Sequence, residues 1–368
     1  MAGAPPSIVV TGISGTLGRR LLPMLKGFNV IGIDVRPPAT DYPDLIFKHI
    51  DLGTEPSCLQ LLEVLRQIRP VAVLHLAFVM DMVRTGVLDT DRMWKINVAG
   101  TARVMEAVTE ANRDWPMIEK FVFLSSVAAY GPQLSRPVTE ESPLAAHTYV
   151  YGIHKMEADR VVQQRAPTLR GGSVYILRPH IFAGVSVDNY FMEAFRGIPG
   201  GASQRARRMR EQGKRLPCML PSGQQYLDHR IQFVHIDDVA RLIVHILRKS
   251  QPESQRLTIL NVAGQGGPLT FAECVRRARA RLIQVPTERL FRLVLEVLWR
   301  TKISTIPPDV APYMTSDTLM DTSRLALFLG VEYQNVIRHT IAAAFSECFE
   351  IDERVPVEAA QVKGGAAG

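Results

Sequence analysis

The chain has 368 residues, of which 46% are hydrophobic and 21% are charged. These proportions are close to the average of folded globular proteins, so they exclude a disordered chain, a collagen-like chain and a small disulfide scaffold. The 43 basic and 36 acidic residues leave a net charge of +7, which is compatible with an anionic ligand but does not require one.

Short apolar strands alternate with helix-like segments in the first half of the chain. We expect strands at residues 7–11, 28–34, 71–77, 121–126 and 174–177, each followed by a segment with the apolar spacing of a helix. This alternation predicts an α/β fold, namely a Rossmann-type, doubly wound parallel sheet with a smaller C-terminal substrate-binding portion.

Beyond residue 180 the pattern is less regular. Residues 197–223 are rich in Pro, Gly and Arg, and we predict no regular element there. The predicted elements that follow are a strand at 233–235, a helix at 237–247, a strand at 257–262 and helices at about 270–283, 287–300 and 336–349. We therefore expect an NAD(P)-binding domain over residues 1–180, a substrate-binding portion interwoven with the sheet over 181–355, and a flexible tail over 356–368.

The cysteines and the N-terminus bear on the cellular compartment. Cys58, Cys218, Cys274 and Cys348 lie far apart without metal-ligand spacing, which predicts reduced thiols and no metal site. The first strand begins without a preceding basic segment, and the longest apolar run, residues 71–79, is far below the roughly 20 residues of a membrane span. We therefore expect a cytoplasmic protein without a signal peptide or membrane span.

Residues 8–18 combine a strand, a glycine-rich turn and the start of a helix. Gly12 permits the tight turn, Gly15 lets the backbone approach a pyrophosphate, and Gly18 allows close packing of helix on strand. The N-terminus of the helix offers N–H groups to phosphate oxygens. The predicted dinucleotide-binding residues of this segment are Gly12, Ser14, Gly15, Thr16, Leu17 and Gly18.

Asp34 ends the next predicted strand, where an acid accepts hydrogen bonds from the adenosine ribose. A carboxylate at this position repels the 2′-phosphate of NADP, so we predict NAD as the cofactor. Arg19 and Arg36 are close in sequence, and for this reason NADP is not excluded.

Tyr151 and Lys155 lie four residues apart, on one face of a predicted helix, and Ser126 ends a predicted strand. The carboxyl ends of parallel strands form the ligand crevice, so Ser126 is placed to contact a substrate oxygen. A lysine ammonium stabilises a nearby phenolate, which lets a tyrosine act as the general base. We predict that Ser126, Tyr151 and Lys155 are catalytic.

These features occur in an order that resembles the extended short-chain dehydrogenases/reductases of the NAD-dependent epimerase/dehydratase type. The resemblance covers about residues 7–330. Besides the segments above, it rests on Asp51-Leu52, His75-Leu76-Ala77, Asn97-Val98-x-Gly100-Thr101, Leu124-Ser125-Ser126-x-x-x-Tyr130-Gly131, Leu177-Arg178-Pro179, Val234-His235-x-x-Asp238-Val239-Ala240 and Asn261-Val262.

The resemblance implies further cofactor contacts and a homodimer formed through helices at about 91–111 and 149–165. The adenine would contact Asp51 and Leu52, and the nicotinamide ribose would lie beside Asn97 and Lys155. The remaining implied cofactor residues are Leu76, Ala77, Phe78, Tyr151, Pro179 and His180. We interpret His75 and His235 as structural histidines, and Asp238 as a carboxylate at a helix start.

The substrate is less well determined by the sequence. Relatives that act on nucleotide sugars usually carry an arginine where this chain has Ile231, although Arg230 is adjacent, and Asn189 matches their diphosphate-binding asparagine. We predict a hydride-transferring oxidoreductase acting on a secondary alcohol or ketone, with a nucleotide sugar as one candidate and Asn189, Arg230 and Ser126 as substrate residues. One alternative is a dehydrogenase of a hydrophobic, steroid- or terpenoid-like alcohol, and a second is a non-catalytic NAD(P)-sensing regulatory protein.

Two further segments allow more than one interpretation. The apolar stripe at 290–299 is interpreted as core packing, with a lipid-facing lid as the alternative. The basic stretch at 205–215 is interpreted as a solvated mobile loop, with a flap that clamps an anionic substrate as the alternative. The stretch lacks interleaved aromatic residues, so we expect no nucleic-acid partner.

Overall fold

A computed structural model describes residues 5–40, 42–80, 89–114, 117–250 and 256–350. Its centre is a sheet of seven parallel strands in the order β11-β6-β5-β4-β1-β2-β3. The strands are β1 (Ser7–Thr11), β2 (Asn29–Asp34), β3 (Leu45–His49), β4 (Ala72–His75), β5 (Lys120–Leu124), β6 (Ser173–Pro179) and β11 (Leu257–Val262). The predicted Rossmann-type parallel sheet is confirmed.

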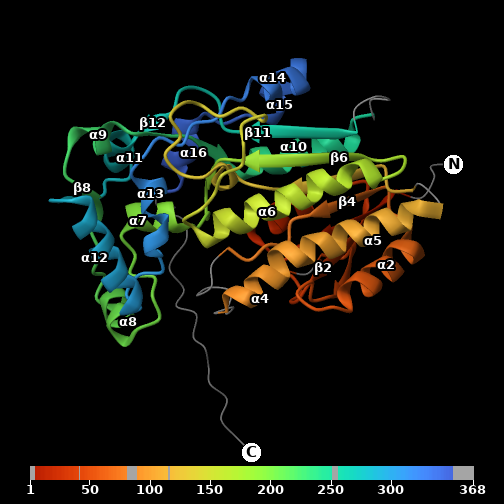
Figure 1. The fold of residues 1–368 in the computed structure, drawn as a ribbon, viewed down its shortest axis with the longest axis horizontal. Coiled ribbons are helices and arrows are strands. Elements are labelled where there is room, and N and C mark those ends of the chain that lie inside the picture. Colours follow the sequence, from red (N-terminus) through yellow and green to blue (C-terminus); the bar gives the residue numbers. More distant parts are fainter. Residues whose placement is uncertain (1–4, 41, 81–88, 115–116, 251–255, 351–368) are drawn as a thin grey trace, which may run out of the picture.

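Helices cover both faces of the sheet (Figure 1). On one face lie α2 (Ser57–Ile68), α5 (Gly100–Asp114) and α6 (Val150–Arg165), and on the other lie α1 (Thr16–Leu21) and α10 (Ile236–Arg248). Successive residues of β1 point to opposite faces, so Ile8 and Val10 pack with α1 and α10 while Val9 packs with α2 and α5. Burial on both faces explains why the strands are continuous apolar segments.

The second half of the chain is interwoven with this sheet. Strand β11 and helix α10 belong to the sheet and its covering layer, whereas the other segments form small two-stranded sheets beside the carboxyl ends of the strands. These pairs are β7 (Ile181–Ala183) with β10 (Phe233–His235), β9 (Arg230–Ile231) with β12 (Leu269–Thr270), and β8 (Cys218–Pro221) with β13 (Leu282–Val285).

The larger helices of this second half are α7 (Tyr190–Arg196), α8 (Gln204–Glu211), α11 (Phe271–Arg277), α12 (Glu288–Arg300), α14 (Ser323–Leu329) and α16 (Ile341–Glu347). Shorter helical segments are α4 (Thr90–Trp94), η2 (Lys95–Ala99), η3 (Val127–Tyr130), α9 (Gln224–Asp228), η5 (Pro308–Val310), α13 (Ala311–Met314) and α15 (Tyr333–Val336), with η1 (Leu22–Met24), η4 (Ala166–Thr168) and η6 (Gly330–Glu332) at helix ends.

The structure corrects several predicted elements. Strand β3 was not predicted because it is an edge strand whose side chains are half exposed, and it lacks a long apolar run. The helix expected at 270–283 ends at Arg277, near Arg279 with its positive φ of 49°, and the chain then forms β13. The helix expected at 336–349 is shorter and begins later, as α16 at Ile341–Glu347, because Thr340 caps its first turn and α15 ends at Val336.

The basic stretch is also corrected. Residues 204–211 form helix α8 rather than an irregular loop, because the Ser203 hydroxyl accepts a hydrogen bond from the Ala206 N–H and caps the first turn. Ala206 is the buried residue of this helix, whereas its arginines are exposed. The expected exposure of the basic stretch is confirmed. The expected absence of regular elements over residues 197–223 is wrong at α8 and at strand β8.

His75 on β4 is a core histidine, as the sequence indicates. Its Nδ1 lies 2.7 Å from Thr11 Oγ1 and its Nε2 lies 2.9 Å from Thr101 Oγ1. Burial, with the positive charge of Lys155 as a smaller cause, lowers the pKa of His75 to about 3. The imidazole is therefore neutral in the folded protein at neutral and mildly acidic pH.

We expect the protein to lose stability as the pH falls below about 6.5. An unfolded histidine binds a proton below that pH, whereas buried His75 does not, so protons favour the unfolded state between pH 6.5 and 3. This residue can lower the free energy of unfolding by up to about 1.4 kcal/mol per pH unit in that window. Urea unfolding at pH 7.5, 6.5 and 5.0 measures the slope. The His75→Gln variant is expected to have a shallower slope, and equal slopes would contradict the assignment.

Candidate active site

Strand β1 ends in a turn whose glycines are required by close backbone contacts. Gly12 has a φ of +73°, and a Cβ placed on it would lie 2.5 Å from the backbone nitrogen of Ala77. A Cβ on Gly18 would lie 2.3 Å from the carbonyl oxygen of Ile13. The backbone segments of this turn therefore approach so closely that only glycine fits at these two positions. Such a turn leaves its backbone N–H groups accessible to phosphate oxygens.

Replacement of Gly12 by alanine is expected to abolish dinucleotide binding and to lower the melting temperature. The new Cβ would overlap the backbone of the segment after β4 and would require a left-handed backbone conformation from alanine. Gly267→Ala is the matched control, because no atom lies within 4 Å of its added Cβ and its φ is not positive. Isothermal titration with NAD and thermal unfolding measure both effects. Full binding by Gly12→Ala would contradict the predicted role of the turn.

Asp34 lies beside the glycine-rich turn, at the carboxyl end of β2. Its carboxylate accepts hydrogen bonds from the backbone N–H of Ser14 at 3.1 Å and of Val35 at 2.8 Å. The Ser14 hydroxyl donates to the Arg36 carbonyl at 2.5 Å, which connects the glycine-rich turn to the segment after β2. The predicted cofactor residues Ser14 and Asp34 are thus neighbours in space.

A cavity of about 280 Å³ lies at the carboxyl ends of the central strands. One part is lined by the glycine-rich turn, and another is lined by aromatic and aliphatic side chains of the C-terminal portion. The predicted site residues that line it are Gly12, Gly15, Thr16, Leu17, Gly18, Leu76, Phe78, Ser126, Tyr151, Lys155, Pro179, His180 and Asn189.

The three predicted catalytic residues meet in this cavity. Ser126 follows β5 and caps η3, where its hydroxyl accepts a hydrogen bond from the Ala128 N–H at 3.2 Å. Tyr151 and Lys155 lie one turn apart on α6, and a hydrogen bond joins Tyr151 to the Ser126 side chain. The Lys155 ammonium donates to the Leu124 carbonyl at 2.5 Å. Two distant segments of the chain therefore place a serine, a tyrosine and a lysine together.

The local electrostatics oppose charge on both titrating groups. Burial raises the pKa of Tyr151 to about 12, and the hydrogen bond from Ser126 lowers it in part. Burial lowers the pKa of Lys155 to about 7, and the negative charge of Asp159 opposes this shift. The Lys155 nitrogen lies 3.6 Å from the centre of the Phe78 ring and 5.8 Å from that of Tyr151. When Lys155 is protonated, its positive charge beside Tyr151 favours the phenolate.

Other predicted cofactor residues are not part of the cavity lining. Asp51 accepts a hydrogen bond from the Gly53 N–H at 2.9 Å and pairs with Arg92 at 3.2 Å. The Asn97 amide is buried and forms two hydrogen bonds with the backbone of Val79, at 2.7 and 2.9 Å. Leu52 is buried, and Ala77 faces Gly12 across the turn.

The two residues predicted to bind a substrate diphosphate are engaged within the protein. Asn189 caps α7, where its Oδ1 accepts from the N–H groups of Phe191 and Met192 and its Nδ2 donates to the Phe182 carbonyl. Arg230 forms a two-point ion pair with Asp317, at 2.9 and 3.1 Å, and is not among the described residues that line the cavity. Only Asn189 of this pair lies at the cavity.

A set of buried residues connects β6, α6 and η3 next to the predicted catalytic residues. Arg178 on β6 is 1% exposed and pairs with Asp159 of α6 through two nitrogens, at 2.9 and 3.0 Å. Asp159 also accepts from the Ser125 hydroxyl at 2.6 Å, next to Ser126. Arg178 reaches η3 by donating to the Tyr130 hydroxyl at 2.8 Å. Asp159 was missed in the sequence, although it lies one helical turn beyond Lys155.

Sequence reasoning also missed part of the cavity wall. Tyr149 immediately precedes α6 and Tyr190 begins α7. Val310, Tyr313 and Thr318 come from a segment well over 100 residues further along the chain. The position of Tyr149 two residues before Tyr151 was an available signal. The later segment has no motif that could have indicated it.

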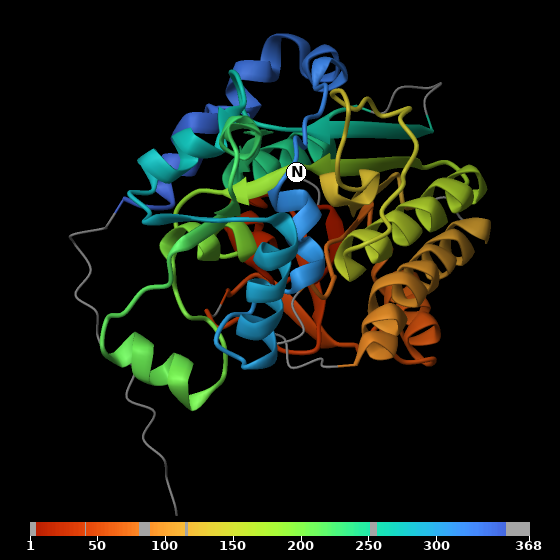
Figure 2. The ribbon, with the colours of Figure 1, turned by 60° about the vertical axis from the view of Figure 1, so that its left-hand side comes forward.

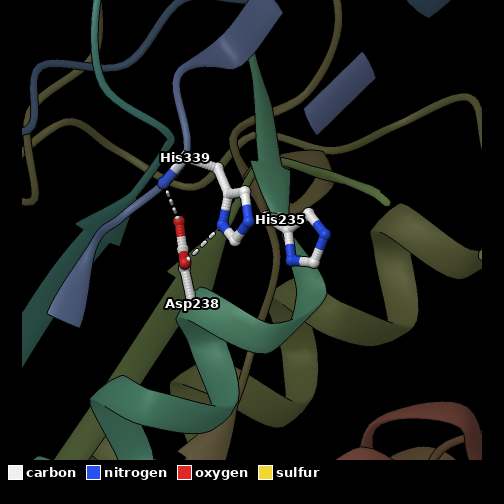
Figure 3. Close-up of side chains that lie close together, drawn as sticks. All are labelled: His235, Asp238 and His339. Carbon is white, nitrogen blue, oxygen red and sulfur yellow. Dashed lines mark hydrogen bonds and ion pairs between the residues drawn. The ribbon is translucent and has the colours of Figure 1, made fainter. Parts of the chain in front are cut away.

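His235, Asp238 and His339 form the one group among the described residues with a composition suited to a metal ion (Figure 3). The two imidazole rings stack at 3.8 Å with an angle of 16°, so their in-plane lone pairs do not converge on one point. Asp238 accepts from the backbone N–H of His339 at 3.0 Å and from its Nδ1 at 2.9 Å. His235 caps α10 and contacts Glu347 at 3.0 Å. The group connects α10 to the C-terminal segment, in agreement with the predicted structural role of His235.

The parallel sheet, the glycine-rich turn and the Ser–Tyr–Lys group define a short-chain dehydrogenase/reductase of the extended type. The sequence profile of the NAD-dependent epimerase/dehydratase family matches residues 8–263, and the chain belongs to this family. The resemblance identified from the motifs is confirmed.

Known proteins are similar to this chain in sequence or in structure. The uncharacterized protein y4nG of Sinorhizobium fredii (strain NBRC 101917 / NGR234) is 28% identical over 236 residues, which are 63% of this chain and about half (51%) of that relative. The UDP-glucose 4-epimerase of Thermus thermophilus, solved with NAD, has a TM-score of 0.65 at 17% identity and covers 93% of this chain and 97% of its own.

Two further solved structures have similar folds. The Bordetella bronchiseptica enzyme WbmH, in complex with NAD+, has a TM-score of 0.63 at 18% identity, covering 94% of this chain and 99% of its own. MoeE5, in complex with UDP-glucuronic acid and NAD, has a TM-score of 0.62 at 20% identity, covering 93% of this chain and 97% of its own. At these identities the similarity establishes the fold. Among the described residues, none of the helices has the length and apolar character needed to cross a membrane.

Proposed function

We propose that the protein is an NAD-dependent oxidoreductase that interconverts a secondary alcohol and a ketone. The observation that carries the proposal is the meeting of Ser126, Tyr151 and Lys155 in the cavity that the glycine-rich turn also lines. The position of Asp34 beside that turn supports NAD rather than NADP, because a carboxylate repels a 2′-phosphate.

The residues present fit a dinucleotide. The turn leaves no room for a Cβ at Gly12 or Gly18, and Asp34 lies at its edge to receive ribose hydroxyls. Leu76, Phe78 and Pro179 offer apolar surface along the same cavity. When bound, NAD supplies the carbon centre that accepts a hydride in oxidation, and its reduced form returns the hydride in the reverse direction.

Within the chain, Tyr151 transfers the proton. In oxidation its phenolate accepts the hydroxyl proton of the substrate, and in reduction the phenol returns a proton to the carbonyl oxygen. Ser126 holds that oxygen through its hydroxyl, and Lys155 stabilises the phenolate by its charge. Epimerisation or dehydration would use the same first step, followed by reorientation of the ketone or loss of water.

The cavity favours a hydrophobic alcohol over a nucleotide sugar. Lys155 is the only lysine or arginine among the described residues that line it, so an anionic diphosphate has no cation there beyond the catalytic lysine. The wall beyond Ser126 is formed by Tyr149, Tyr190, Phe191, Val310 and Tyr313. Such a wall binds an apolar skeleton, since its stabilisation comes from removing apolar surface from water.

Thr318 offers one polar contact at this wall. The residue is 4% exposed and lines the cavity, and its hydroxyl has no hydrogen-bond partner among the described residues. A buried hydroxyl without a partner is destabilising, so a polar group of the substrate that reached it would contribute to binding. We therefore favour an apolar substrate that carries a second polar group.

A substrate panel tests these proposals. Purified protein with NAD is incubated with uncharged sterol and terpenoid secondary alcohols, with UDP-glucose and with UDP-glucuronic acid, and NADH formation is followed by absorbance. We expect turnover of a hydrophobic alcohol, and the same panel with NADP is expected to give lower rates. Because a 4-epimerase leaves no net NADH, the sugar nucleotides are also analysed by chromatography for the epimer. Turnover confined to UDP-sugars would overturn the preference for an apolar substrate while supporting the oxidoreductase.

The regulatory alternative predicts a different outcome. A protein that only senses NAD(P) would bind the dinucleotide and turn over no compound, and it would capture a partner protein only when the dinucleotide is present. The assembled Ser126, Tyr151 and Lys155 favour chemistry, because sensing alone does not require all three groups.

A further inference from the structure

Helix α12 has an exposed apolar stripe beside its exposed arginines. Leu290, Leu293 and Val297, which share one side of the helix, are 40%, 56% and 51% exposed. Phe291 and Leu295 on the inner side are buried and hold the helix to the rest of the protein. The helix therefore presents apolar side chains both to the core and to solvent, whereas a surface helix normally presents a polar outer face.

Helix α8 and the residues after it form an exposed basic segment. Arg205, Arg207, Arg208, Lys214 and Arg215 are exposed, and none of them forms an ion pair with another described residue. The arginines of α12 differ in this respect, because two of its exposed cations are paired with glutamates one turn away. The charge of α8 is therefore not neutralised by acids of the described chain.

The two helices are joined at their ends. The backbone N–H of Gly201, just before α8, donates to the Ile303 carbonyl at 2.9 Å, and that of Ser203 donates to the Lys302 carbonyl at 3.0 Å. Ile198, at this junction, is 42% exposed. Both helices lie at the end of the molecule remote from α2 and α5, and Figure 2 shows this end turned towards the viewer (Figures 1 and 2). We call residues 204–215 and 288–302 the α8/α12 surface.

The α8/α12 surface holds the entire excess charge of the protein. It contains ten of the 43 basic residues and three of the 36 acidic residues. The rest of the chain therefore has 33 residues of each sign, and the net charge of +7 belongs to these two segments. Because the rest of the chain has no net charge, electrostatic attraction to an anionic partner acts mainly through the α8/α12 surface.

We propose that the α8/α12 surface docks on the surface of an anionic lipid bilayer. The exposed arginines of α8, with Lys214 and Arg215 after it, would contact lipid phosphates, and Leu290, Leu293 and Val297 would enter the headgroup region. Nucleic acid offers the same charge but leaves exposed aliphatic side chains without apolar contact, so the combination favours lipid. The proposal is independent of the reaction, although α12 packs on η5, which contributes Val310 to the active-site cavity.

Vesicle flotation tests the proposal with the full-length protein. Vesicles of phosphatidylcholine alone and of phosphatidylcholine with phosphatidylglycerol are used at low and high salt. We expect binding to the anionic vesicles only, with loss of binding in high salt because ions screen the contact. Arg205→Glu/Arg208→Glu is expected to weaken binding about tenfold or more, since each basic residue near an anionic leaflet contributes roughly fivefold. Leu293→Ser/Val297→Ser is expected to weaken it severalfold and to leave the salt dependence unchanged.

A matched charge change on another face provides the control. Arg66→Glu/Arg165→Glu alters exposed arginines of α2 and α6, and it is expected to bind vesicles as the unchanged protein does. Circular dichroism and thermal unfolding establish that each variant is folded. Absence of binding by the unchanged protein, or an equal loss in the control, would overturn the proposal. It would also be overturned if the α8 and α12 substitutions changed only the sedimentation of the protein, because the surface would then contact a second copy of the chain.

Discussion

Tyr151→Phe is expected to lower turnover about a thousandfold and to leave NAD binding within a factor of two. The substitution removes the one phenol hydroxyl that joins Ser126 in the cavity, and general acid–base catalysis contributes about 10²–10⁴ to such reactions. Its ring remains to pack edge-on against Phe78, at 5.6 Å between ring centres, so the fold is retained. Initial rates of NADH formation and calorimetric titration of NAD measure the two quantities.

Tyr175→Phe is the matched control for this substitution. Tyr175 lies in the first half of β6, is 1% exposed and packs edge-on against Phe328, away from the carboxyl ends of the strands. Loss of its hydroxyl is expected to leave turnover unchanged. Normal turnover by Tyr151→Phe would exclude Tyr151 as the proton-transferring residue, and equal losses in both variants would indicate a general effect on folding.

Asp159→Asn is expected to lower the free energy of unfolding by about 3–5 kcal/mol. The substitution leaves the Arg178 guanidinium buried and without a counter-charge, since Asp159 is its paired carboxylate and is itself fully buried. It also weakens the contact between α6, which carries Tyr151 and Lys155, and strand β6. Urea unfolding measures the loss, which is expected to exceed that of any surface ion pair.

Two further variants show whether the loss of stability comes from a buried unpaired charge or from the loss of an ion pair as such. Arg160→Met removes an exposed ion pair on the same helix, with Glu157 at 2.8 Å, and is expected to cost less than about 1 kcal/mol. Removing both partners, as Asp159→Leu/Arg178→Met, is expected to recover part of the stability because no buried charge then lacks a partner. If Asp159→Asn were no more destabilising than Arg160→Met, the buried pair would not support α6.

Much of the site could be predicted because its residues follow local rules. The glycine-rich turn, Asp34 and the Tyr151–Lys155 pair each depend on the backbone geometry of a strand end or of one helical turn. Ser126 was found because parallel strands end at the same edge of a sheet. Such features depend only on short segments, so the spacing of residues in the sequence is enough to predict them.

Contacts between remote segments were not predictable in the same way. Thr318 and Val310 reach the cavity from a segment without a motif, and Arg230 pairs with Asp317 across 87 positions in the chain. Asp159 carries no signal of its own because its role depends on the opposing Arg178. These contacts result from how the C-terminal portion packs on the sheet. The periodicity of a short segment does not indicate which distant segment it will contact.

The net charge of +7 likewise has one aspect that the sequence determines and one that depends on the tertiary structure. The sequence alone determined the size of the excess, the parallel sheet and the proposed catalytic and cofactor residues, because composition, periodicity and motif spacing are properties of the chain itself. Only the tertiary structure decided that the basic stretch is a helix, that three aliphatic residues of α12 face solvent and that the two helices adjoin. The physical reason is that exposure depends on which segments pack together, and a helical apolar stripe has the same spacing whether it faces a core or the solvent.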